Sequence, residues 1–133
     1  MGKISYPEVL TELLSALPEI RPRYEKDAWL LSDWQGAPTL YSVFGLVLKP
    51  FLTEALDLNK DSSLLTRIFE FLERMASSRD TEVINLLGVG IFEDLVCHPN
   101  QLATAWKYMG PETRKIARKI ARASRREANV PRG

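Results

Sequence analysis

The chain has little of the chemistry that most enzymes and metal proteins use. Its 133 residues include one cysteine, Cys97, and one histidine, His98. A single cysteine excludes an internal disulfide, and CxxC, HExxH and calcium-loop spacings are all missing. Neighbours on a helix point about 100° apart, so we interpret this pair as a buried thiol and a helix-end histidine, and not as a catalytic dyad. The sequence therefore predicts no catalysis, no cofactor and no bound metal.

Long apolar runs are also missing. The N-terminal residues lack the apolar segment of a secretion signal. The most apolar stretch, residues 83–96, contains Asn85, Glu93 and Asp94 and is shorter than a bilayer-spanning helix. We therefore expect a cytoplasmic protein without membrane insertion.

Strand patterns are missing as well, because no segment sustains an alternation of apolar and polar residues. Apolar residues instead recur three and four positions apart, as on one face of a helix. The pattern predicts an all-α, single-domain bundle of six to seven helices over residues 1–128, with a flexible C-terminal tail at 129–133. Two adjacent helices, 62–77 and 80–97, are joined by a short turn, which suggests hairpins stacked as in HEAT repeats. The oligomeric state is left open.

Capping residues mark several predicted helix ends. They are Ser5 with Glu8 as a capping box, Asp61 or Ser62, Asp80, and Gly110 as a C-terminal cap followed by Pro111 as the first residue of the last helix.

Two helix interiors contain residues that usually weaken a helix. Helical spacing continues unchanged from residue 40 to residue 56 across Pro50, which predicts a helix that kinks there; two helices that meet at Pro50 are the alternative. Gly88 and Gly90 lie in a helix that is apolar nearly all round. Close approach of a neighbouring helix would offset their low helix propensity.

Positive charge is concentrated at the C-terminal end. Residues 111–133 carry eight basic and two acidic side chains, whereas the other 110 residues carry ten basic and fifteen acidic ones. On a helix that reaches Arg126, the basic residues cover an arc of about 140°. The net charge of +1 therefore conceals a molecule with opposite charges at two places.

The basic helix has four interpretations. It is a solvated face, a nucleic-acid-binding stripe, a membrane-surface helix, or a contact for an acidic protein surface. The aromatic residues Trp29 and Trp34, beside Asp27 and Asp33, are either core or an interface cluster, since aromatic anchors ringed by charge are common in interfaces. Trp106 has the same two interpretations.

Several segments match a recognisable pattern, which is mostly made of core and cap positions. They are residues 41–45, 49–52, 67–76, 80–87 and 105–113, within a region of about 5–120. In these segments the chain resembles a bacterial family of small helical domains whose members are similar to immunity proteins encoded beside polymorphic (Rhs-type) toxins. The resemblance implies a stoichiometric inhibitor of a toxin domain and supplies no catalytic residues. The strongly basic last helix departs from that pattern.

The leading hypothesis is a protein-binding, immunity-type protein that neutralises a cognate toxin domain by direct complex formation. The alternative is a helical protein that binds nucleic acid through the basic C-terminal helix. The candidate partner-binding residues are Asp27, Trp29, Asp33, Trp34, Glu70 and Glu73 for a basic partner, and Arg114, Arg118, Arg122 and Arg125 for an acidic one.

Overall fold

The segments with helical spacing of apolar residues form a succession of helices. The computed structural model describes residues 4–32 and 39–132, with the backbone alone at 28–32. Within these ranges every regular element is helical, which confirms the all-α prediction. In the same ranges the elements join into seven continuous helical stretches, and the short η6 is a separate turn after the last of them. The elements are η1 (Tyr6–Glu8), α1 (Val9–Ala16), η2 (Pro18–Ile20), α2 (Arg21–Ser32), α3 (Leu40–Val43), η4 (Phe44–Leu48), α4 (Lys49–Leu58), α5 (Ser62–Ala76), α6 (Thr81–Leu87), η5 (Gly88–Phe92), α7 (Glu93–Leu95), α8 (Pro99–Trp106), α9 (Pro111–Ala123) and η6 (Glu127–Asn129).

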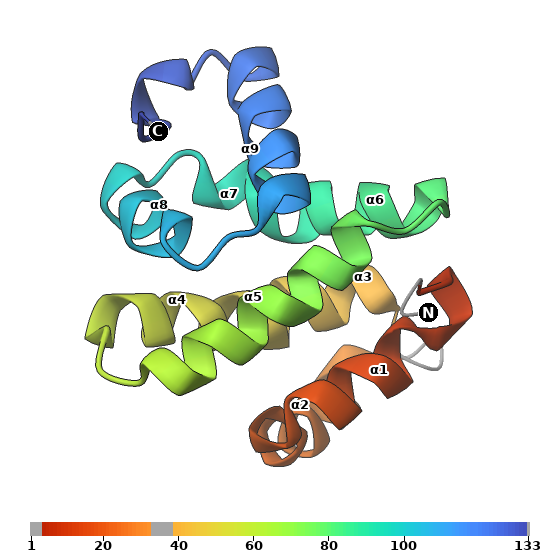
Figure 1. Ribbon diagram of the computed structural model, residues 1–133. Coiled ribbons are helices and arrows are strands. Elements are labelled where there is room, and N and C mark those ends of the chain that lie inside the picture. Colours follow the sequence, from red (N-terminus) through yellow and green to blue (C-terminus); the bar gives the residue numbers. More distant parts are fainter. Residues whose placement is uncertain (1–3, 33–38, 133) are drawn as a thin grey trace.

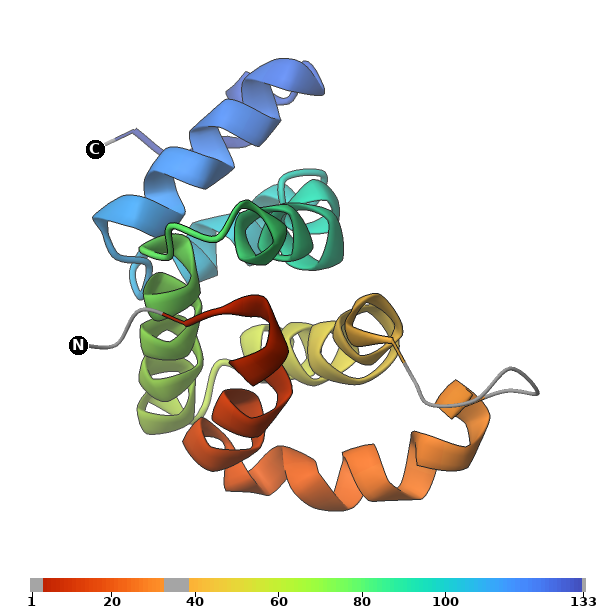
Figure 2. The same cartoon turned by 90° about the vertical axis from the view of Figure 1, so that its right-hand side faces the viewer.

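The helices pack in three levels. In Figure 1, α1 and α2 lie lowest, α3 to α5 lie in the middle, and α6 to α9 lie above them. Figure 2 shows α5 running along one side of the molecule, from the level of α9 to that of α1, and α5 contacts both helices. The first and the last long helical units of the chain therefore dock on the same helix.

One continuous apolar core joins these levels. Its largest fully buried side chains include Phe44, Phe69, Phe71 and Phe92, which come from three different helical stretches. Among the described residues, Thr113 is the buried polar one. Burial of apolar surface is therefore the main source of stability.

The helix that contains Pro50 is continuous from Leu40 to Leu58, as the unbroken spacing predicted. Its deformation is a π-helical segment, η4, directly before the proline: the amide of Lys49 donates to the carbonyl oxygen of Phe44, five residues earlier. In a regular α-helix the ring of Pro50 would clash with the carbonyl four residues before it. The wider π turn accommodates the ring, so the helix does not end there.

Gly88 and Gly90 lie where neighbouring helices approach closely, as the sequence predicted. A Cβ atom on Gly90 would lie 3.0 Å from Cβ of Phe44 in η4, and one on Gly88 would lie 3.2 Å from Cδ1 of Ile120 in α9. Each glycine thus brings a different helix against η5, which is itself π-helical. This contact positions α9, the helix with the concentrated positive charge.

Most predicted caps are confirmed. Asp61 accepts a hydrogen bond from the amide of Leu64 at 3.0 Å. Asp80 accepts one from the amide of Glu82 at 3.0 Å and another from the amide of Tyr6 at 2.8 Å, so it also ties the N-terminal segment to α6.

The Ser5–Glu8 cap is confirmed and the Gly110 cap is wrong. The carboxylate of Glu8 accepts from the amide of Ser5 at 3.1 Å. Gly110 was predicted to end a helix, yet α8 already ends at Trp106. Gly110 instead precedes Pro111 as the N-cap of α9, with an ordinary φ of −82°.

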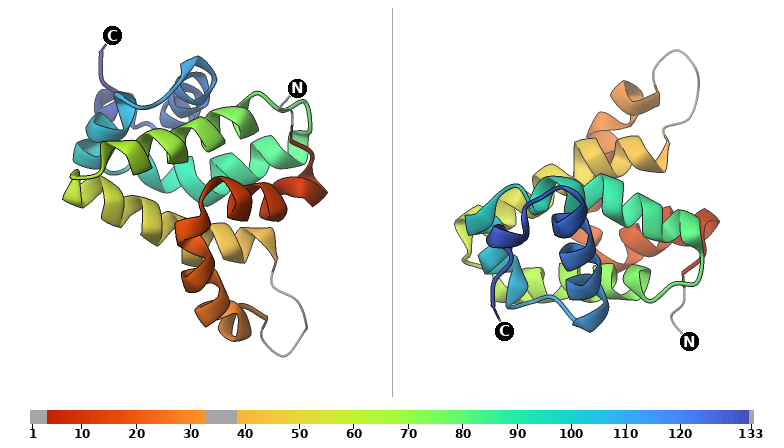
Figure 3. Two further views of the ribbon diagram at one scale, coloured as in Figure 1. Left: turned by 60° about the horizontal axis from the view of Figure 1, so that its bottom comes forward. Right: turned by 90° about the horizontal axis from the view of Figure 1, so that it is seen from above.

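The hairpin and the tail were further predictions. α5 and α6 form the expected hairpin (Figure 3, left), whereas a HEAT-type stack stays a prediction. At the start of the predicted tail, the side-chain amide of Asn129 donates to the carbonyl oxygen of Val96 at 2.9 Å, and Val130 packs against the core. Across the described ranges, no helix combines the length and apolarity that a membrane span requires.

Candidate protein-binding surface

Helix α9 combines one small apolar face with a wide basic face. Ala117 and Ala121 are completely buried, and α9 contacts both α5 and η5. Small side chains allow this close packing and leave the longer basic side chains on the outside. Arg118, Lys119 and Arg122 are exposed as a result.

The N-terminus of α9 is held by Glu73, a carboxylate of α5. Its Oε2 atom accepts from the amide of Glu112 at 2.9 Å, and its Oε1 atom accepts from both the amide and the hydroxyl of Thr113 at 2.9 Å. A negative charge here satisfies amides that have no partner within the helix and is favoured by the helix dipole. Gly110 leaves room for it, because a Cβ atom there would lie 2.5 Å from Cδ of Glu73.

This contact corrects one predicted site residue. Glu73 was expected beside Glu70 on the outer face of α5, available to a basic partner. Glu70 is exposed, but Glu73 is half-buried and its carboxylate is occupied by α9. The sequence interval of about forty residues between Glu73 and Thr113 explains why helical spacing alone did not reveal the contact.

Two of the predicted arginines converge on Trp106. The Cζ atoms of Arg114 and Arg118 each lie 5.1 Å from the centroid of the indole ring, a cation–π distance. Arg114 also donates to the carbonyl oxygen of Trp106 at 2.7 Å. Trp106 is 6% exposed, so it belongs to the core and orients the arginines from below.

The C-terminus of α9 comes earlier than predicted. The helix was expected to reach Arg126, but it ends at Ala123. The amide of Arg126 donates to the carbonyl of Ala121 at 2.6 Å, and that of Arg125 donates to the carbonyl of Arg122 at 3.3 Å. This pair of bonds is a Schellman motif, and Arg125 takes its left-handed position with φ 59°. Arg125 therefore lies outside the helical stripe.

Two hollows flank α9. Arg118 and Arg122, together with Glu127 and Val130 of the C-terminal segment, line a shallow one, on the side where that segment curls back (Figure 3, right).

The second hollow is a groove between α9 and the helix formed by α6, η5 and α7. Its lining is mainly apolar, with polar groups at its edges. The lining residues are Ile84, Asn85, Gly88, Val89, Glu93, Ile116, Lys119, Ile120 and Ala123. The sequence analysis missed this groove. One signal for it was present, since Ile116 and Ile120 are four residues apart beside the basic stripe and so form an apolar strip on the last helix. The helix that faces this strip lies about thirty residues earlier in the chain, so the sequence did not show that the two form a groove.

One acidic candidate, Asp27, lies at the other end of the molecule from α9. Asp27 is half-buried on α2, and α2 and α9 lie at opposite ends of the fold in Figures 1 and 2. The side chain of Trp29 lies outside the described part of the structure, as do residues Asp33 and Trp34. Asp27 and the basic candidates thus belong to two separate surfaces, whereas Glu70 lies on α5, which contacts α9.

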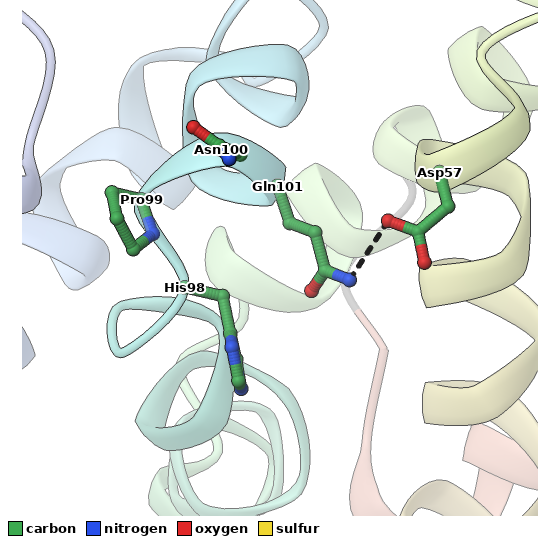
Figure 4. A pocket seen from close by; sticks show the side chains of 5 residues that line it. All are labelled: Asp57, His98, Pro99, Asn100 and Gln101. Atoms are coloured by element: carbon green, nitrogen blue, oxygen red, sulfur yellow. Dashed lines mark hydrogen bonds between the residues drawn. The ribbon is translucent and has the colours of Figure 1, made fainter.

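A third hollow lies near the single histidine. Gln101 reaches toward Asp57 and donates to its Oδ1 atom at 3.0 Å, as Figure 4 shows. Nε2 of His98 lies 3.4 Å from Oδ1 of Asp94 on the preceding turn. Cys97 is exposed, so the prediction of a buried thiol is wrong. Over the part of the chain that the structure describes, no cluster of three or more histidine, cysteine or carboxylate side chains could hold a metal ion.

The fold and its surfaces define an all-α domain that presents a basic helix, with an apolar groove beside it. The chain belongs to the family described as Domain of unknown function (DUF7674), whose model matches residues 10–124. Comparison with curated proteins gave no match, and comparison with solved structures gave none either.

Proposed function

We propose that this protein is a non-catalytic binding domain that neutralises a toxin domain by forming a direct complex, with α9 as its main contact surface. The observation that carries the proposal is the row of uncompensated charges on that helix. Arg118, Lys119 and Arg122 are exposed and make no ion pair with any described residue.

The helix α9 and two of its arginines, Arg114 and Arg118, are held in place before any partner arrives. Glu73 fixes one end of the helix, the Schellman motif at Arg125 fixes the other, and Trp106 orients two arginines. Ordered charges lose less conformational entropy on binding than flexible ones. Complementary charge also accelerates encounter and selects the partner. An acidic protein surface is therefore the partner chemistry that α9 fits best.

The remaining candidates supply a second contact in this proposal. Asp27, Trp29, Asp33, Trp34 and Glu70 would meet a basic region of the same toxin domain. The helix α2, which carries Asp27, lies at the opposite end of the molecule from α9, so a single compact partner would contact α9 or α2, and only an extended one would reach both.

Co-purification with the product of the neighbouring gene tests the proposal. We expect a complex at micromolar concentration, and about a hundredfold weaker binding when Arg118→Glu and Arg122→Glu are combined, because several desolvated charge contacts are reversed. The control combines Lys60→Glu with Arg79→Glu. It changes the net charge equally at exposed positions of the loops after α4 and after α5, and it should alter affinity by no more than about threefold.

Two results would contradict the proposal. One is the absence of a complex at micromolar concentration. The other is equal loss of affinity in the α9 variant and the control, because net charge alone would then explain the binding.

Nucleic-acid binding is the second candidate, and the same row of cations favours it. Arg118 and Arg122 are one helical turn apart, a spacing of about 6 Å that suits contacts to successive phosphates. This function predicts affinity for a DNA or RNA duplex that falls steeply with salt and disappears when both arginines become glutamate. No shift in a gel at low salt would exclude it.

A further inference from the structure

The groove between α9 and the α6–α7 helix offers what the basic row of α9 lacks, namely exposed apolar surface. Val89 is 52% exposed on the η5 side, and Ile116 and Ile120 are half-buried on the α9 side. The close approach at Gly88, where Cδ1 of Ile120 lies 3.2 Å from the position of a Cβ atom, keeps the floor of the groove shallow.

One wall of the groove has a length that suits a helix. α9 crosses the helix formed by α6, η5 and α7 steeply (Figures 1 and 2), so a bound helix can follow only one of the two, and the lining residues of α9 extend from Ile116 to Ala123, which is about 10 Å. An α-helix rises about 10 Å between positions i and i+7, so three apolar side chains at i, i+4 and i+7 would fill this length.

The two walls differ in charge, and this difference selects an orientation. Lys119 is exposed on the α9 wall. Lys115, one turn before it on the same helix, is also exposed, and its Nζ atom lies 3.5 Å from Oε1 of Glu112. The opposite wall carries Asn85 and the exposed carboxylate of Glu93. A helix that lies in the groove therefore gains from carboxylates on the side that faces α9 and loses from carboxylates on the side that faces α7.

From these observations we infer that the groove receives an amphipathic α-helix of the partner protein, with an apolar stripe at i, i+4 and i+7 and acidic residues along the flank over α9. The inference rests on the proposed function, because it names the part of the partner that binds. It adds an apolar anchor to the electrostatic contact. Buried anchors commonly supply most of the affinity of an interface, whereas rim charges chiefly set its specificity.

A displayed library of helical peptides of about 18 residues tests the inference. Leucine is fixed at i, i+4 and i+7, and the flanking positions vary among glutamate, lysine and glutamine. Selection on the full-length protein should enrich glutamate on one flank only. Selection on Lys119→Glu should enrich lysine at the same positions, because the variant reverses the charge of that wall.

Variants of the groove identify where the selected peptides bind. Val89→Asp should weaken them about tenfold or more, since it places a charge in the apolar contact. Ala123→Arg, at the exposed end of α9, is a second variant that blocks the groove without changing the core. The matched control is Leu58→Asp, which changes an exposed leucine at the end of α4 and should leave the affinity within about twofold.

Three outcomes of these experiments would overturn the inference. Peptides that bind Val89→Asp and Ala123→Arg as tightly as the unaltered protein occupy another surface. Enrichment of lysine on the flank that faces α9, on the unaltered protein, gives the wrong charge. A dimer of the free protein that Val89→Asp dissociates would mean that a second copy fills the groove.

The toxin-binding experiment separates this inference from the proposed function. Full neutralisation by Val89→Asp would contradict the groove and leave the role of the α9 charges intact. Failure of the unaltered protein to bind the toxin, together with acidic peptides that do bind the groove, would contradict the proposed function alone.

Discussion

The N-terminal helices and the C-terminal helix α9 both dock on α5, but they use charge in different ways. On the N-terminal side, Glu12 pairs with Arg74 at 2.6 Å, and Glu19 forms a two-pronged ion pair with Arg67, in which Nη1 lies 2.9 Å from Oε1. The acids are seven residues apart, and so are the arginines. Glu12 lies on α1 and Glu19 on η2, so two successive helical elements pair with two turns of α5.

On the α9 side, α5 contributes only one carboxylate, Glu73, and it binds backbone amides and a hydroxyl. The cations of α9 remain outside this contact. The N-terminal unit therefore uses its charges to hold the fold together, whereas α9 is held by a cap and apolar packing, and most of its charges stay available. This difference is the reason why we propose the α9 end of the molecule as the one that meets a partner electrostatically.

The largest expected effect comes from removal of the Glu73 carboxylate, which caps α9. Glu73→Ala should lower the free energy of unfolding by about 2–3 kcal/mol, because three hydrogen bonds to one charged group are lost at the N-terminus of α9. Chemical denaturation measures the change. Glu70→Ala on the same helix is the control and should cost less than about 0.5 kcal/mol, since Glu70 is exposed. Similar losses in both variants would contradict the structural role of Glu73.

A methyl group at Gly110, which lies against the Glu73 carboxylate, tests the same structural role of Glu73. Gly110→Ala should cost about 1–2 kcal/mol, because its Cβ atom would displace the Glu73 carboxylate from its place. In the double variant with Glu73→Ala the two losses should not add, since both act on one contact. The control is Gly45→Ala, which meets no atom within 4 Å and should stabilise the helix slightly. Additive losses would show that Gly110→Ala acts on a contact other than that of Glu73.

The other end of α9 offers a stabilising change. Arg125 has a left-handed backbone with φ 59°, which glycine adopts without steric cost. Arg125→Gly should raise the free energy of unfolding by about 1 kcal/mol. Thermal unfolding of this variant beside Arg126→Gly, whose φ is −118°, separates the backbone effect from the lost charge. A gain in both variants would point to charge repulsion as the cause.

The smallest effects are expected on the N-terminal side. Arg67→Ala should cost less than about 1 kcal/mol, because its ion pair with Glu19 is largely exposed to solvent. Salt should reduce the difference further. A loss as large as that of Glu73→Ala would reverse the comparison between the two sides.

This ion pair also has a pH signature. Hydrogen bonding to Arg67 lowers the pKa of Glu19 from 4.5 to about 2. A lowered pKa means that the folded state favours the charged carboxylate, so its stabilisation is complete above pH 4.5 and is lost as the pH falls towards 2. Glu19→Gln should remove this part of the acid dependence, which unfolding midpoints between these two values would measure. An unchanged acid dependence would show that the pair contributes nothing to folding.

Much of the fold follows from interactions between residues close in sequence. Asp61 and Asp80 cap the helices that they precede, and the unbroken apolar spacing across Pro50 corresponds to one continuous helix. Each of these signals acts within about five residues, so it can be recognised in the chain alone. The same holds for the concentration of cations on one face of the last helix.

The arrangement of the site depends on contacts between different helices. Glu73 reaches α9 across about forty residues, Trp106 packs beneath Arg114 and Arg118, and the groove needs Ile84 and Ile116 on facing helices. A helical pattern states which side chains share a face, but which neighbour covers that face is decided by packing of the whole core. The helices and the charge of their exposed faces can thus be recognised in the chain alone. Packing between helices sets which charged side chains form contacts within the protein and which remain free at its surface.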